Sequence, residues 1–325
     1  MREAVGLAER VSSTDANVLI TGESGAGKDV LASFIHWKSR RATKPFVKID
    51  CATLPGELLE AELFGYERGA FTGASEAKPG RLEAAQKGTI VLDEIAHLST
   101  GAQAKLLRVI EMREFERLGG RNTIKLDARL IALTNVDLAQ AVQAGRFRED
   151  LFYRLDVIHI RVPPLRERKE DLSKLIKHFV KHYSVKHGRK LDSVAAPALA
   201  LLQAYDYPGN ARELGNIIER LVIVAAGKSI EESDLPLGLS AAVQARRLKD
   251  RPRTLAEMEA AYISEMLAVT KGNKAECARI LGISRKNLYE KIARYELLKP
   301  IHRLRRLAKR LEVTADVLLS KALSA

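Results

Sequence analysis

Short apolar runs alternate with helical patterns through the first half of the chain. Five runs are rich in β-branched residues and have the length of strands: 18–22, 45–50, 89–94, 129–135 and 156–163. Between them, apolar residues recur with the spacing of helices. This alternation predicts the α/β class, with a parallel sheet flanked by helices.

Two consecutive prolines, Pro163 and Pro164, mark a change in this pattern. They end the last predicted strand, and helical periodicity follows to about residue 235, with a break at YPGN (207–210). Further helical segments come after a stretch of Gly, Ser, Ala and basic residues that is typical of a linker. The predicted organisation is an α/β subdomain (1–165), a helical lid (166–236), a linker (237–253), an all-α helix-turn-helix domain (254–298) and a basic helical extension (299–325).

The positive charge of the chain gathers near its C-terminal end. The 325 residues carry a formal net charge of +13. Residues 241–325 hold 19 Lys or Arg and 9 Asp or Glu, whereas the preceding 240 residues hold 35 and 32. A clustered positive field beside a nearly neutral body indicates a phosphate-backbone partner; a solvated basic face is the simpler alternative.

The apolar segments and the cysteines point to the interior of the cell. No apolar run approaches the roughly 18 residues that span a bilayer, and the N-terminal segment lacks the apolar centre of a secretory signal. We therefore expect a cytoplasmic protein with no membrane partner. Cys51 and Cys277 match no metal-ligand spacing and are interpreted as reduced packing thiols.

The segment GESGAGKD (22–29) has the features of a phosphate-binding loop. It follows the apolar strand VLIT and precedes a helical pattern, which is the context such a loop requires. Its glycines let backbone N–H groups turn toward phosphate oxygens, and Lys28 is placed to bridge the β- and γ-phosphates. Asp29 stands where many such loops carry the Ser or Thr that holds magnesium. The candidate nucleotide-binding residues are Gly22, Glu23, Ser24, Gly25, Ala26, Gly27, Lys28 and Asp29.

Two of the later predicted strands end in polar residues suited to hydrolysis. The run TIVLDE ends in Asp93, the candidate magnesium partner, and Glu94, which is placed to activate the attacking water. The run RLIALTN ends in Thr134 and Asn135, which are candidates to sense the γ-phosphate or hold the water. A strand-ending Asn is often only a turn former, so its interpretation rests on this context.

Two arginines follow in GRFREDLFYRL (145–155), among aromatic and apolar residues. Arg148 and Arg154 are candidates to stabilise the charge of a phosphate held by a neighbouring subunit, which would make hydrolysis depend on assembly. Ion pairs with Glu149 or Asp150 are the ordinary alternative.

The segment ELFGYERGAFTGA (62–74) is the most specific in the chain. Two glycines flank Phe71 and Thr72, which predicts a mobile tip that exposes an aromatic side chain to a partner. With the phosphate loop and the Asp-Glu pair, its GAFTGA element resembles the AAA+ domain of NtrC-type enhancer-binding proteins, the bacterial activators of sigma-54 RNA polymerase. The predicted partner-binding residues are Gly69, Ala70, Phe71, Thr72, Gly73 and Ala74.

The resemblance extends to about Leu298 and implies a mechanism. ATP with Mg²⁺ would bind between the subunits of a homo-oligomeric ring, a hexamer by resemblance. Hydrolysis would move the GAFTGA loops against the sigma-54 RNA polymerase holoenzyme and open the promoter complex. By resemblance, Lys28, Asp93 and Glu94 form the catalytic core, Asn135 is the first sensor, Arg148 and Arg154 act in trans, and Arg212 is the lid sensor.

Two positions depart from the family's pattern. Asp50 stands where many members have an Asn that restrains the catalytic Glu, and Tyr207 replaces a Trp often found before Pro-Gly-Asn. A carboxylate at position 50 would weaken or retune that restraint, whereas one large aromatic for another is a milder change. The resemblance begins inside the family's pattern, as expected of a fragment or of a member without its own regulatory domain.

Residues 254–298 read as a long helix followed by a helix-turn-helix. Ala278 and Leu281 contribute to a tight apolar face, Gly282 permits the turn and Ser284 caps the second helix. The segment resembles the Fis-type domain of these activators, which implies binding to double-stranded enhancer DNA. A bare helical hairpin would leave the basic excess unexplained. The candidate DNA-binding residues are Ser284, Arg285, Lys286, Asn287, Tyr289 and Lys291.

Other interpretations stay open from the residues alone. A different AAA+ machine, such as a replication initiator or a chaperone, would share the ATP site but would have no use for GAFTGA. A DNA-binding repressor with a decayed ATPase is conceivable because of Asp50. In the extension, LAKRLEVTADVL weakly resembles a second helix-turn-helix, and a basic segment that strengthens phosphate binding is the simpler account.

Overall fold

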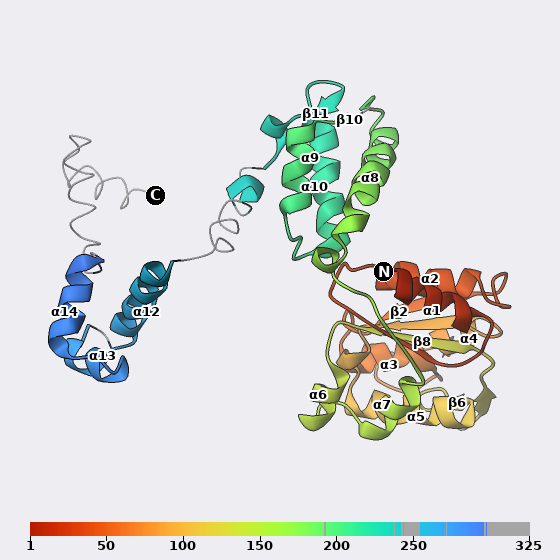
Figure 1. Ribbon diagram of the computed structural model, residues 1–325. Helices are drawn as coiled ribbons and strands as arrows, with labels where there is room; N and C mark the ends of the chain where they lie inside the picture. The colour runs from red at the N-terminus through yellow and green to blue at the C-terminus, as the bar shows by residue number, and fades with distance from the viewer. Residues whose placement is uncertain are drawn as a thin grey trace. The chain divides into compact units, whose positions relative to one another are not determined.

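The computed structural model describes residues 1–191, 193–236, 238–241, 243, 254–270, 272–295 and 297 (Figure 1). Its contacts divide the chain into two units, Met1–Gln244 and Ala245–Ala325, and each is described by itself. None of the described helices has both the length and the apolar character needed to cross a bilayer.

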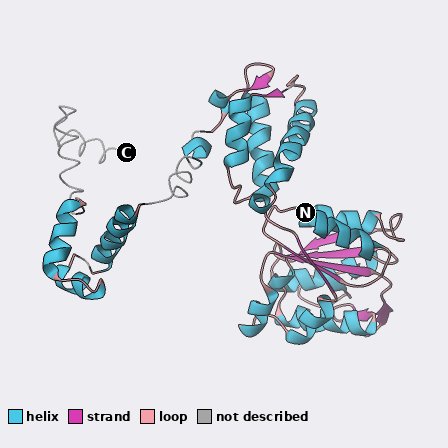
Figure 2. Ribbon diagram, viewed as in Figure 1, coloured by secondary structure: helices cyan, strands magenta, loops and turns pink. Residues whose placement is uncertain are grey.

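A parallel sheet of five strands forms the centre of the first unit (Figure 2). Its strands lie in the order β2-β5-β8-β1-β9, and every pairing is parallel. They are β1 (Val18–Thr21), β2 (Phe46–Asp50), β5 (Thr89–Asp93), β8 (Arg129–Thr134) and β9 (Ile158–Arg161). The predicted α/β class is confirmed. β8 is buried along its whole length, as expected of a strand covered on both faces.

Helices cover both faces of this sheet and form two separate cores. On one face lie α1 (Arg2–Ser12) and α2 (Lys28–Trp37). The other face packs against α3 (Gly56–Phe64), α4 (Arg81–Ala84), α5 (Thr100–Met112), α6 (Leu138–Gln143) and α7 (Glu149–Leu155). Alternate residues of the central strands enter alternate cores, as Ile131 and Ala132 do on β8.

A buried arginine ties α1 to the sheet. Arg129, on β8, is 1% exposed and donates to the carbonyl oxygens of Val11 and Ser12 at 2.8 and 3.0 Å. Burial lowers the pKa of its guanidinium. The two carbonyls lie at the C-terminal end of α1, where helix carbonyl groups have no intrahelical partner and a cation is favoured. The charge therefore fixes α1 against the sheet.

Two short hairpins, which the sequence pattern did not predict, lie beside this sheet. They pair β3 (Gly65–Tyr66) with β4 (Lys78–Pro79) and β6 (Glu114–Glu116) with β7 (Thr123–Lys125). The loop of the second hairpin joins the first, because the Leu118 N–H donates to the Gly65 carbonyl at 2.9 Å. Arg117 adds ion pairs to Glu67 and Glu83.

The lid is a helical layer with its own core. Its helices are α8 (Leu172–Lys186), α9 (Ala196–Ala204) and α10 (Asn210–Val224), with a small parallel pair, β10 (Ser193–Val194) and β11 (Ser229–Ile230). Tyr207 is fully buried in that core and donates from its hydroxyl to the Leu202 carbonyl at 2.7 Å. Leu239 and Val243 are also buried there, so lid packing continues into the segment predicted to be a linker.

The second unit contains α12 (Leu255–Val269), α13 (Lys274–Ile280) and α14 (Arg285–Arg294) around a small apolar core. The first and last of these helices begin at side-chain caps, Thr254 and Ser284. Cys277 lies in this core and Cys51 in that of the sheet, both as free thiols. The predicted extension 299–325 lies outside the described residues.

Candidate functional site

The loop between β1 and α2 is shaped by glycines and by the lid. Gly25 has a φ of +72° and Gly27 a φ of +103°, both in the left-handed region. A Cβ atom at Gly25 would lie 2.4 Å from the Gly209 carbonyl oxygen and 2.9 Å from Cβ of Arg212. Only glycine therefore allows the loop to approach the lid this closely.

Lys28 lies at the start of α2 with its side chain folded back under the loop. It is 6% exposed, and its ammonium donates to the Gly22 carbonyl at 2.8 Å. Burial lowers its pKa, while the nearby carboxylates of Glu94, Asp93 and Asp29 oppose that shift. The cation is thus held where backbone N–H groups and the N-terminal end of α2 also favour an anion.

Glu94 faces this lysine from the end of β5. Its Oε1 atom is 3.9 Å from Nζ of Lys28, and its Oε2 atom accepts from the Asn135 N–H at 3.3 Å. Glu94 has a φ of +51°, which is an unusual backbone conformation for a non-glycine residue. Strained conformations of this kind occur often at functional sites. Asp93 accepts from the Glu94 N–H at 3.0 Å. The structure therefore brings Lys28, Asp93, Glu94 and the backbone of Asn135 together.

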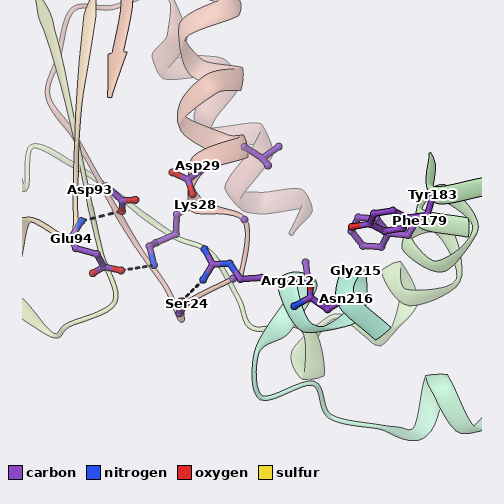
Figure 3. A pocket seen from close by; sticks show the side chains of 14 residues that line it. Ser24, Lys28, Asp29, Asp93, Glu94, Phe179, Tyr183, Arg212, Gly215 and Asn216 are labelled. Atoms are coloured by element: carbon purple, nitrogen blue, oxygen red, sulfur yellow. Dashed lines mark hydrogen bonds and ion pairs between the residues drawn. The ribbon is translucent and has the colours of Figure 1, made fainter. Parts of the chain in front are cut away.

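A cavity of about 310 Å³ opens beside these groups, with the lid forming its other wall. Figure 3 shows Lys28 and Glu94 joined on the sheet side and Phe179 and Tyr183 on the lid side. The two aromatic rings, on α8, have centroids 6.0 Å apart. A flat apolar surface next to fixed cations suits a nucleobase joined to phosphates. No sequence motif includes Phe179 or Tyr183. They line the cavity only because the fold places α8 beside the phosphate-binding loop.

Several lid residues bind the phosphate loop directly. The Asn210 amide donates to Glu23 and to the Ser24 carbonyl, each at 3.0 Å, and its oxygen accepts from the Leu165 N–H at 2.7 Å. Arg212, the predicted lid sensor, donates to the Ser24 hydroxyl at 2.9 Å. Of these contacts, only Arg212 had been expected from the sequence.

Two further arginines reinforce the same junction. Arg166 pairs with Glu23 at 2.6 Å, and buried Arg168 donates to the Ala26 carbonyl at 2.5 Å. Hydrogen bonds from Arg166 and Asn210 lower the pKa of Glu23 to about 2. The loop and the lid are consequently bound by charged and neutral contacts at once.

The carboxylates near the loop fit a divalent cation in their chemistry. Mg²⁺ is commonly held by one or two carboxylates together with substrate phosphates, and Asp93 lies at the cavity with Asp29 one residue after Lys28. In the described part of the chain, no three His, Cys, Asp or Glu residues gather as a metal cluster. Lys48, on β2, binds both Asp29 and Asp93 and separates them.

The two arginines predicted to act on a neighbouring subunit's phosphate form ion pairs within this chain, and Asp50 bonds within its own loop. Arg148 pairs with Asp150 at 2.6 Å and Arg154 with Glu111 at 2.9 Å. The Asp50 carboxylate accepts from the Ala52 N–H at 2.9 Å, and within the described residues it makes no hydrogen bond to Glu94.

The GAFTGA loop lies at the end of the β3–β4 hairpin. Gly69 and Gly73 have positive φ values, and the Gly69 N–H donates to the Ala74 carbonyl at 2.8 Å, which closes the loop. Phe71 is 41% exposed and its ring meets the edge of Tyr66 with centroids 5.0 Å apart. The loop thus presents an aromatic side chain on a structured base.

In the second unit, the candidate DNA-binding residues differ in their surroundings. Arg285, Lys286 and Asn287 are exposed on the first turn of α14. Tyr289 is also exposed, and the Lys274 ammonium lies 4.8 Å from its ring centroid. Lys291 instead pairs with Glu259 of α12 at 2.6 Å, so its side chain is directed toward the neighbouring helix.

Comparisons with known families match three consecutive parts of the chain. Residues 1–161 match the Sigma-54 interaction domain, 166–251 the AAA+ ATPase lid domain, and 254–295 the Bacterial regulatory protein, Fis family. The fold and the loop define an AAA+ P-loop protein with an appended helix-turn-helix.

Individual relatives agree with this. The chain is 48% identical over 294 residues to regulatory protein AtoC of Escherichia coli, covering 88% of this chain and 64% of AtoC. Transcriptional regulatory protein FlbD of Caulobacter vibrioides is 44% identical over 311 residues, covering 91% and 68%. The crystal structure of NtrX from Brucella abortus in complex with ATP has a TM-score of 0.67 at 36% identity, covering 91% of this chain and 67% of NtrX. The chain belongs to the NtrC-type family of sigma-54-dependent enhancer-binding regulators.

Proposed function

We propose that this protein hydrolyses ATP to remodel a promoter complex of the sigma-54 RNA polymerase holoenzyme, while its C-terminal domain binds enhancer DNA. The observation that carries the proposal is the combination in one chain of the Lys28–Glu94 site, a complete GAFTGA loop and a basic helix-turn-helix. NtrX, which shares this fold, has been solved with ATP and with ADP, which supports the choice of nucleotide.

In this mechanism the residues of the cavity have different roles in phosphoryl transfer. Lys28 and the loop N–H groups hold the β- and γ-phosphates, and Glu94 accepts a proton from the attacking water and orients it. Asn135 holds Glu94 through its backbone N–H. Asp93 is the candidate ligand of Mg²⁺, which would neutralise phosphate charge when bound. Arg212 reports nucleotide occupancy to the lid through its contact with Ser24.

Arg148 and Arg154 act from a neighbouring subunit in a ring, with six subunits as the family pattern implies. Both lie near the ends of α7 and are exposed enough to exchange their present partners, Asp150 and Glu111, for a phosphate. Turnover per subunit is then expected to rise with protein concentration. Equal turnover in dilute and assembled samples would refute the trans-acting role.

The test of the whole proposal is open-complex formation with purified protein, ATP, sigma-54 holoenzyme and a sigma-54 promoter. Thr72→Ala and Phe71→Ala are expected to abolish opening while leaving ATP hydrolysis in place, because both side chains lie outside the cavity. Glu94→Gln is expected to abolish both. A different AAA+ machine would open no promoter with any variant, and a repressor with a decayed ATPase would have no hydrolysis for Glu94→Gln to remove.

A further inference from the structure

A lysine outside the phosphate-binding motif lies between Asp93, the candidate metal ligand, and Asp29 at the end of that motif. Nζ of Lys48 is 2.8 Å from Oδ2 of Asp93 and is also hydrogen-bonded to Oδ1 of Asp29. Asp93 is at the end of β5 and Asp29 is in the first turn of α2. One ammonium group therefore joins carboxylates from two elements that converge at the phosphate site.

Strand register accounts for this placement. Lys48 pairs with Val91 across β2 and β5, and Asp93 is two residues further along β5. Because side chains alternate along a strand, Lys48 and Asp93 extend from the same face of the sheet, which is the face that α2 covers. The long side chain of Lys48 then reaches Asp93 on the neighbouring strand. From there its ammonium also contacts Asp29, which lies in the first turn of α2 on the same face of the sheet.

We propose that Lys48 is a built-in counter-ion that competes with the divalent cation for Asp93, so that the metal loads by displacing the Lys48 ammonium from this carboxylate. The inference rests on the proposed nucleotide site. Without metal, the ammonium neutralises two carboxylates that would otherwise repel a nucleotide phosphate. With metal, Asp93 exchanges one cation for another while Asp29 keeps Lys48 nearby.

A purely structural ion pair is a weaker explanation of the arrangement. The Lys48 and Asp29 side chains are 38% and 47% exposed, and exposed pairs of this kind contribute little to stability. Asp93 is only 13% exposed, so the ammonium beside it is screened less and changes the local electrostatics more. Removal of the charge should therefore alter cation binding more than folding.

The test measures binding of fluorescent ADP, which needs no hydrolysis, in EDTA and across a Mg²⁺ titration. Lys48→Met is expected to lower the Mg²⁺ concentration at half-maximal ADP binding about tenfold and to weaken ADP binding in EDTA several-fold, because two carboxylates lose their cation. Direct Mn²⁺ binding, followed by electron paramagnetic resonance, should tighten in parallel. Lys48→Gln provides a second neutral side chain if the methionine variant misfolds.

Two controls separate this effect from a general change of charge. Lys48→Arg keeps the cation and should remain within about twofold of the parent in both conditions. Lys44→Met removes an exposed lysine just before β2 and should change neither value. The inference is overturned if both neutral variants leave the Mg²⁺ midpoint unchanged or raise it. Failure of the parent protein to bind ADP at any Mg²⁺ concentration would instead refute the nucleotide site itself.

Discussion

The side-chain amide of Asn210 donates a hydrogen bond to the Ser24 carbonyl at 3.0 Å, which joins the first turn of α10 to the phosphate-binding loop. Asn210 is fully buried and has a φ of +55°, and its oxygen accepts from the Leu165 N–H. One residue thus connects the loop, the lid and the segment between sheet and lid. These hydrogen bonds couple the position of α10 to that of the loop.

Replacement of Asn210 separates its hydrogen bonds from its backbone conformation. Asn210→Gly keeps the left-handed backbone and removes the amide, which should cost about 1–3 kcal/mol of unfolding free energy because buried partners lose their bonds. Asn210→Ala should cost about 1 kcal/mol more, since alanine is strained at this φ. Urea denaturation checks both values. Equal losses in the two variants would show that backbone strain is not stored here.

Acid should weaken the junction between loop and lid through Glu23. Its pKa is lowered to about 2 from an ordinary value of 4.5, first by its hydrogen bond with Arg166. The associated stability is therefore complete above about pH 4.5 and is lost as the pH falls toward 2. The side chain is 40% exposed, so the gain is modest, under about 1 kcal/mol.

The measurement is the difference in melting temperature between the parent and Glu23→Gln from pH 6.5 to 3.5. We expect the parent to be the more stable protein at pH 6.5 and the difference to shrink below pH 4.5. Glu9→Gln is a matched control with an exposed carboxylate outside the loop. A difference that stays constant or grows with acid would contradict the pKa shift of Glu23.

Exchange of Asp50 should leave catalysis nearly intact. The carboxylate accepts from the Ala52 N–H in its own loop, and an asparagine oxygen can accept the same bond. We expect Asp50→Asn to change ATP turnover by less than about threefold, whereas Glu94→Gln should reduce it about 10²-fold or more. A steady-state ATPase assay on assembled protein compares them. A tenfold or larger effect of Asp50→Asn would mean that the residue does control Glu94 during turnover.

The sheet was predictable because its strands are local patterns. All five expected runs became strands, with ends within two residues of the predicted ones, and the phosphate loop lies between β1 and α2 as its motif requires. The β3–β4 and β6–β7 hairpins escaped prediction, since runs of two or three residues carry no periodicity.

In the nucleotide site, the sequence predicted only those residues that belong to a recognisable motif. Lys28, Asp93 and Glu94 stand in recognisable strings, but Lys48 reaches Asp93 through strand register, and Phe179 reaches the cavity through the packing of α8. Pairs of this kind are far apart in sequence and follow from the three-dimensional fold. Lys291 illustrates the converse, because its helical position looked free until α12 placed Glu259 beside it.

The ion pair between Lys291 and Glu259 gives two lysines of α14, Lys286 and Lys291, different expected contributions to DNA binding. Lys286 is exposed on the first turn, whereas Lys291 is 22% exposed and paired with Glu259. If the exposed turn contacts phosphate, Lys286→Met should weaken binding to all duplexes and reduce the slope of log affinity against log salt by about 1. Lys291→Met should leave that slope unchanged, because its charge is already neutralised within the domain. Fluorescence anisotropy at several salt concentrations measures both slopes, and equal reductions would mean that DNA draws Lys291 away from Glu259.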